Sequence, residues 1–158
     1  MITYKSGYKH QLSRDVCFQT DIRLLYPIST EWLTLTANGL LYIKRGYAWD
    51  GPSGEIKLLG IINIDVTKDD ETSMQGSLVH DALYQLIRLG LLSINYRKDA
   101  DKLLRDICIS DGMYELKANA WYKVVRKVAT FAAEFESEPK EIICGNDYFC
   151  IKLEQTSL

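Results

Sequence analysis

The chain has 158 residues, of which 47% are hydrophobic and 25% charged, and these values predict one globular domain spanning residues 1–158. The net charge of −2 does not indicate a nucleic-acid partner, and no apolar run approaches the roughly 20 residues needed to span a bilayer. Residues 1–7 lack the apolar core of a signal peptide and the four cysteines contain no CxxC pair, so we expect a cytoplasmic protein with reduced thiols. Pairing of Cys144 with Cys150 stays open for an oxidising compartment.

The N-terminal part of the chain has the pattern of β-structure. Residues 1–30 alternate loosely between polar and apolar side chains, which predicts one or two strands that end at the Tyr26-Pro27 pair. The apolar positions at strand spacing are Val16, Phe18, Ile22 and Leu24. Over residues 31–45, two β-rich runs flank the Asn38-Gly39 pair, which accepts the positive φ angles of a type I′ turn and predicts a hairpin.

A loop rich in turn-forming residues follows the hairpin. Segment 46–54 combines glycine, proline, aspartate and serine with aromatic side chains, which indicates an irregular loop packed back on the domain. In one interpretation Asp50 or Ser53 aims inwards, and in the other Asp50 only bonds the backbone amides of a tight turn. Residues 57–66 have the pattern of a strand or an extended segment.

A helix over residues 72–89 is the most informative element, with Thr72 or Ser73 as its N-cap and Gly90 just after its end. At about 100° per residue, one side of this helix collects polar groups that can orient, accept or donate a proton. These groups belong to Ser77, His80, Asp81, Tyr84 and Arg88. A solvated helix face normally carries lysine and glutamate, so this composition indicates a functional site or a buried hydrogen-bond network.

Two further helices are predicted over residues 96–110 and 115–135, followed by short strands within 141–153. The complete pattern predicts an α+β fold in which a small antiparallel sheet packs on about three helices. Asp101 lies at the edge of the buried stripe of the second of these helices. Because short connections favour antiparallel neighbours, we expect Asp101 to face His80 or Tyr84.

A hydrogen bond from one ring nitrogen of His80 to Asp101 would fix the ring tautomer and leave the other nitrogen as a general base. Asp81, with Asp50 or loop carbonyls, offers oxygen ligands for a divalent cation, calcium or magnesium, which would polarise a carbonyl or phosphoryl group. The predicted catalytic residues are therefore His80, Asp101 and Tyr84, and the predicted metal ligands are Asp81 and Asp50. Ligand-binding roles are predicted for Trp49, Ser53, Ser77, Arg88 and Arg97. In the alternative, buried His, Asp and Tyr side chains form a structural network without catalysis.

Several ordered motifs across about residues 40–128 resemble a small domain family of unknown function found mostly in bacteriophages and prophages, which implies a phage or prophage source. The motifs are Tyr47-Ala-Trp49-Asp50-Gly51-Pro52-Ser53, Ser77–Gln85, Arg97–Asp101, Gly112-Met113 and Tyr122–Arg126. A more distant similarity, to phospholipase A2, lies in a His-Asp-x-x-Tyr helix followed by a helix that carries an aspartate. That resemblance implies His80 as general base, Asp81 as calcium ligand and Asp101 as the group orienting His80, with Tyr84 as a supporting hydroxyl.

Two functional hypotheses follow from these patterns. The first is a metal-assisted hydrolase of esters or phosphoesters, of phage origin and located in the cytoplasm of the infected host. The second is a non-catalytic phage protein that binds a host factor, for example a defence factor, or is a virion component. It predicts that the polar stripe of the 72–89 helix is sealed, or that an exposed apolar patch or a symmetric homo-oligomer interface dominates the surface, with Tyr47, Trp49 and Trp32 as candidates for the patch.

Overall fold

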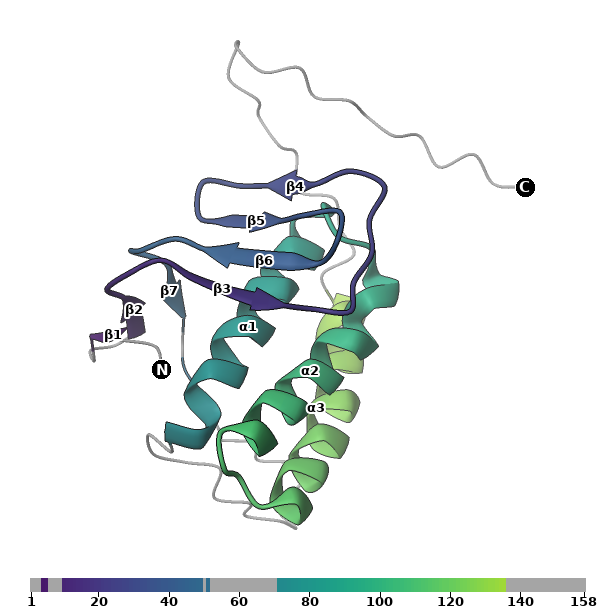
Figure 1. The fold of residues 1–158 in the computed structure, drawn as a ribbon. Helices are drawn as coiled ribbons and strands as arrows, with labels where there is room; N and C mark the ends of the chain where they lie inside the picture. The colour runs from purple at the N-terminus through teal and green to yellow at the C-terminus, as the bar shows by residue number, and fades with distance from the viewer. Residues whose placement is uncertain (1–3, 6–9, 50, 52–70, 136–158) are drawn as a thin grey trace.

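The structure is a computed structural model, and it describes residues 4–5, 10–49, 51 and 71–135 (Figure 1). The fold is α+β, as the sequence predicts, with small antiparallel sheets and three long helices. The strands are β1 (Tyr4–Lys5), β2 (His10–Leu12), β3 (Val16–Gln19), β4 (Ile28–Ser29), β5 (Leu33–Leu35), β6 (Leu40–Ile43) and β7 (Ala48–Trp49). The helices are α1 (Glu71–Arg88), α2 (Arg97–Ser110) and α3 (Glu115–Phe135), with a single 3₁₀ turn, η1 (Ile94–Tyr96), before α2.

The strands form two sheets, one with the order β1-β2-β7 and one with the order β3-β6-β5-β4. The prediction of one or two strands within residues 1–30 is wrong, because β1 to β4 all begin there and β4 follows the Tyr26-Pro27 pair. Strands of two to four residues are too short to show a clear alternation of polar and apolar positions. Ile22 is 3% exposed although it lies outside any strand, so burial in a loop produced part of the apparent strand pattern.

The predicted hairpin is present as β5 and β6, but its turn differs from the predicted type I′ turn. The Gly39 N–H donates to the Thr36 carbonyl at 3.0 Å, and the Thr36 N–H donates to the Leu40 carbonyl at 3.0 Å. The loop therefore has three residues, with Gly39 at φ +85° in its last position. A Cβ at Gly39 would lie 2.5 Å from the Ile22 carbonyl oxygen, so the close approach of the preceding loop also requires glycine here.

Helix α1 lies between the strands on one side and α2 and α3 on the other (Figure 1). Alternate side chains of β5 and β6 point towards α1 and form one wall of the core. The fully buried residues of this wall are Leu33, Leu35, Leu41 and Ile43, and those of α1 are Leu78, Val79, Ala82, Leu83 and Leu86. The core thus surrounds α1 and fixes its orientation, which also fixes the polar side of the helix.

The three predicted helices are confirmed within one or two residues at each end. Helix α1 begins at Glu71, so Thr72 and Ser73 lie inside it, and neither is the N-cap that the sequence predicted. Gly90 follows α1 with φ +69°, and the Leu91 N–H donates to the Leu86 carbonyl at 3.0 Å, as in a Schellman ending. The predicted stop at Gly90 is therefore confirmed.

Helices α1 and α2 approach closely at Gly76. A Cβ at this position would lie 2.7 Å from the Cys108 sulfur and 3.0 Å from the Leu104 carbonyl oxygen. Glycine therefore permits the close contact between the helices that brings their polar side chains within hydrogen-bond reach.

Several predictions concern residues outside the described part of the chain. These are the extended segment 57–66, the C-terminal strands within 141–153, the inward orientation of Asp50 or Ser53, and the pairing of Cys144 with Cys150. Within the described residues, no helix combines the length and the hydropathy that crossing a membrane requires.

Candidate functional site

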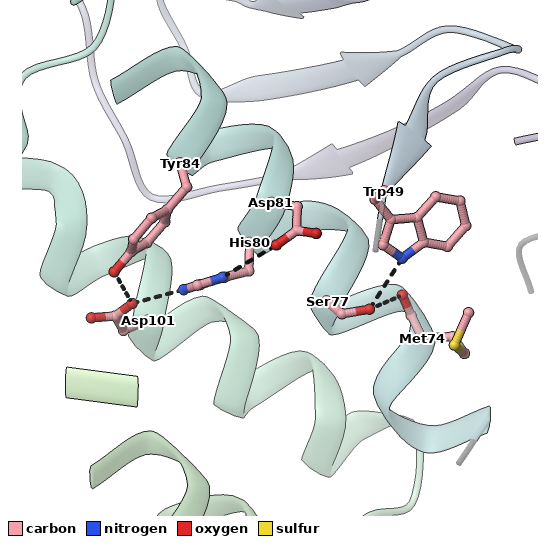
Figure 2. Close-up of polar contacts among 7 residues, drawn as sticks. All are labelled: Trp49, Met74, Ser77, His80, Asp81, Tyr84 and Asp101. Carbon is pink, nitrogen blue, oxygen red and sulfur yellow. Dashed lines mark hydrogen bonds and ion pairs between the residues drawn. The ribbon is translucent and has the colours of Figure 1, made fainter. Parts of the chain in front are cut away.

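Asp101 is the centre of a polar cluster in which all three helices take part, and Figure 2 shows its two partners on α1. Its side chain has no exposed surface. One carboxylate oxygen, Oδ1, accepts hydrogen bonds from Nε2 of His80 at 2.8 Å and from the Tyr84 hydroxyl at 2.7 Å. The other, Oδ2, accepts one from Nη1 of Arg126 at 2.8 Å. This cluster of His80, Tyr84, Asp101 and Arg126 is called the Asp101 network below.

Local helix geometry places three of these four residues. His80 and Tyr84 are four residues apart on α1, so they share one face, and their ring centroids lie 4.1 Å apart. Asp101 lies one turn into α2, which packs against that face of α1. The predicted contacts of Asp101 with His80 and with Tyr84 are therefore both present in the structure.

Arg126 is the member of the network that reasoning from residue patterns missed. It lies on α3, and its side chain is 30% exposed while its guanidinium reaches the buried carboxylate. A signal was available, because a fully buried carboxylate with two uncharged partners is costly and normally requires a cation. An arginine on a helix that packs against Asp101 was the residue to look for.

The contacts determine the charge state of each group. Burial alone would raise the pKa of Asp101, but the hydrogen bonds from His80, Arg126 and Tyr84 outweigh burial and hold it below its ordinary value of 3.8. Burial would lower the pKa of His80, yet contacts with Asp101 and Asp81 raise it above 6.5. Burial and the bond to Asp101 both raise the pKa of Tyr84, so its hydroxyl stays protonated and donates.

The second ring nitrogen of His80 points to a different neighbour. Nδ1 lies 3.9 Å from Oδ1 of Asp81, which is beyond hydrogen-bond length. The side chains of His80 and Asp81 are 14% and 35% exposed. Because Asp101 occupies Nε2, Nδ1 is the nitrogen that remains for proton transfer, and it lies on the side of the ring nearest Asp81.

A cleft of about 400 Å³ lies beside Asp81, between β7 and the part of α1 that follows Asp81. The described residues that line it are Tyr47, Ala48, Trp49, Asp81, Gln85, Arg88 and Leu89. The polar stripe of α1 is thus divided. His80 and Tyr84 face α2, whereas Asp81 and Arg88 line the cleft.

Trp49 and Ser77 join β7 to α1 on the other side of the stripe (Figure 2). The Trp49 Nε1–H donates to the Ser77 hydroxyl at 3.2 Å, which itself donates to the Met74 carbonyl at 3.0 Å. Trp49 is 2% exposed and Tyr47 5%, so the prediction that they form an exposed apolar patch is wrong. Both aromatic side chains pack into the core, and only Trp32, at 37%, is exposed.

The remaining predicted site residues have different positions. Arg97 is the first residue of α2, and its charge partly opposes the rise in the pKa of Tyr84. Arg88 lines the cleft. Asp50 and Ser53 lie outside the described residues. The described residues contain no group of three or more His, Cys, Asp or Glu side chains that could hold a metal ion. Asp81 is therefore the one described carboxylate of the predicted metal pair.

Calcium takes six to eight oxygen ligands, whereas magnesium is commonly bound through one or two carboxylates and keeps several waters. Asp81, partly exposed at the edge of the cleft, offers one carboxylate.

Comparison of the chain with protein-family models, with curated proteins and with solved structures finds no match.

Proposed function

We propose that the protein is a hydrolase of ester or phosphoester bonds in which His80 is the general base. The observation that carries the proposal is the hydrogen bond between Nε2 of His80 and the buried carboxylate of Asp101. Tyr84 and Arg126 hold that carboxylate from two further directions, so the ring is oriented before any substrate binds.

The chemistry follows from this arrangement. Nδ1 of His80 removes a proton from a water molecule while the water oxygen attacks the carbonyl carbon or phosphorus of the substrate. The bond to the leaving oxygen breaks, and the imidazolium returns the proton to that oxygen, so the products are an alcohol and an acid. Asp101 stays ionised and stabilises the imidazolium, and Tyr84 and Arg126 keep the carboxylate in place.

Asp81 has two roles in the proposed mechanism. It contributes to the raised pKa of His80, so the neutral base predominates only at a pH above that raised value. It also offers an oxygen ligand for a magnesium ion, which when bound would polarise the carbonyl or phosphoryl oxygen. A phage or prophage source is part of the proposal and rests on the motif resemblance.

The second candidate function is non-catalytic binding to a host or phage protein. Leu25 is 91% exposed and Tyr26 78%, and these adjacent side chains form an apolar tip on the loop between β3 and β4. In this case the Asp101 network only locks the three helices together.

The proposal is tested by turnover and by metal titration of the purified chain. Aryl acetates and aryl phosphates are screened with magnesium, using the wild type, His80→Ala and Asp106→Asn, an exposed carboxylate on α2 outside the network. Hydrolysis that is lost only in His80→Ala supports the proposed hydrolase function. If the wild type hydrolyses neither class of substrate, that function is refuted. In calorimetric titrations, magnesium binding should be lost in Asp81→Asn and kept in His80→Ala, and equal binding by Asp81→Asn and the wild type contradicts the metal role.

A further inference from the structure

The cleft beside Asp81 contains polar side chains that the Asp101 network does not use. Asp81, Gln85 and Arg88 lie on one side of α1 and line the cleft. The side chains of Gln85 and Arg88 make no hydrogen bond or ion pair anywhere in the described part of the chain. Polar side chains without a protein partner are ordinary on an exposed helix surface, where water solvates them. Here the two side chains border a concave site of about 400 Å³, where a ligand can bond to them.

The lining indicates what kind of group the cleft accommodates. Arg88 is the only cation among the lining residues that the structure describes, and a guanidinium offers paired N–H donors that match two oxygens of a phosphate. The Gln85 amide adds a further N–H donor one helical turn from Asp81. The volume lies near the lower end of the range for small-molecule sites, and the surface that the described lining residues present is mostly polar.

We propose that this cleft binds the phosphate group of a small phosphoester, with Arg88 and Gln85 donating to its oxygens. This inference rests on the proposed hydrolase function and narrows its substrate class to phosphoesters. A phosphate held between Gln85 and Arg88 lies about one to two helical turns from Asp81, whose carboxylate faces Nδ1 of His80 at 3.9 Å.

The charges of the lining give this proposal two opposite consequences. Arg88 attracts the phosphate, so Arg88→Gln should weaken binding. Asp81 is the only carboxylate among the described residues of the lining and repels the phosphate in the absence of a metal, so Asp81→Asn should tighten binding. Lys98→Gln removes the same charge as Arg88→Gln from an exposed position on α2 outside the cleft, and serves as the matched control.

The experiment is calorimetric titration of the full chain with phenyl phosphate, without metal and at low salt, with benzoate and phenol as comparison ligands. We expect Arg88→Gln to weaken phenyl phosphate binding at least about tenfold, because a bidentate charged contact is lost, with Lys98→Gln within about twofold of the wild type. Equal weakening by both variants, or benzoate binding as tight as phenyl phosphate, overturns the assignment.

The test separates this inference from the proposed function because binding is measured without turnover. If hydrolysis of aryl acetates depends on His80 but phenyl phosphate binding is unchanged in Arg88→Gln, the hydrolase proposal stands and the phosphate site is refuted. If phenyl phosphate binding depends on Arg88 but no ester is hydrolysed, the phosphate site stands and the hydrolase proposal is refuted. Tighter binding in Asp81→Asn supports the site, and unchanged binding there contradicts the placement of the phosphate next to Asp81.

Discussion

Replacement of Asp101 by asparagine tests the network on which the site depends. The carboxylate accepts three hydrogen bonds and asparagine has only one oxygen. If that oxygen faces His80 and Tyr84, the new NH₂ group faces the guanidinium of Arg126. If the amide is flipped, the NH₂ group faces Nε2 of His80 and the Tyr84 hydroxyl. The first orientation places a donor opposite a donor, and the second avoids this only if Nε2 of His80 and the Tyr84 hydroxyl both change from donor to acceptor.

The size of the effect follows from burial and charge. A hydrogen bond to a charged group contributes about 1.5–3 kcal/mol, and breaking a buried ion pair costs about 3–5 kcal/mol. Arg126 is 30% exposed and regains water when its partner is lost, which reduces the cost. We therefore expect Asp101→Asn to lower the free energy of unfolding by about 2–4 kcal/mol at pH 7.

Urea unfolding followed by circular dichroism measures this change, with Asp106→Asn as the control. Asp106 is on the same helix, is 44% exposed and pairs with the adjacent Arg105, so its replacement should change the free energy of unfolding by less than about 0.5 kcal/mol. A loss for Asp101→Asn no larger than that of the control would refute the network.

The pH dependence gives a second check on Asp101. Its pKa in the folded protein is lowered from 3.8, so the carboxylate contributes stability above that value and loses it as the pH falls through the folded pKa. The difference in unfolding free energy between the wild type and Asp101→Asn should therefore be largest between pH 3.8 and 6.5, where Asp101 is ionised and His80 is protonated. It should shrink as the pH is lowered below 3.8, and a difference that grows below that value would contradict the lowered pKa.

Three further predictions concern α1. In NMR titrations the imidazole of His80 should have a pKa above 6.5, and Asp81→Asn should lower it because that carboxylate stabilises the imidazolium; a wild-type pKa at or below 6.5 contradicts the described contacts. Gly76→Ala should lower the unfolding free energy by about 1–3 kcal/mol despite better helix propensity, because its Cβ would lie 2.7 Å from the Cys108 sulfur. An unchanged urea midpoint would show that α1 and α2 can move apart. Gly90→Ala should cost about 1–2 kcal/mol through its φ of +69° alone, since no atom lies within 4 Å of the added Cβ, and a neutral result would mean that α1 ends differently.

The sequence by itself determined the helices and much of the candidate site. The 3.6-residue period placed α1, α2 and α3 to within one or two residues, and Gly90 marked the end of α1. The contacts of Asp101 with His80 and Tyr84 followed from which face of each helix carried them and from the short connection between α1 and α2. Such features depend on neighbours within a few residues, so a local pattern records them.

Only the tertiary structure decided the contacts that join distant segments. The sequence pattern grouped Asp81 and Arg88 with His80, but packing turns His80 towards α2 and leaves the other two in a cleft beside β7. Arg126 joins the network because α3 packs against α2, and its own neighbours in the sequence do not indicate this contact. The distance and rotation between packed helices depend on how side chains from separate segments fit together, and no local periodicity contains that information.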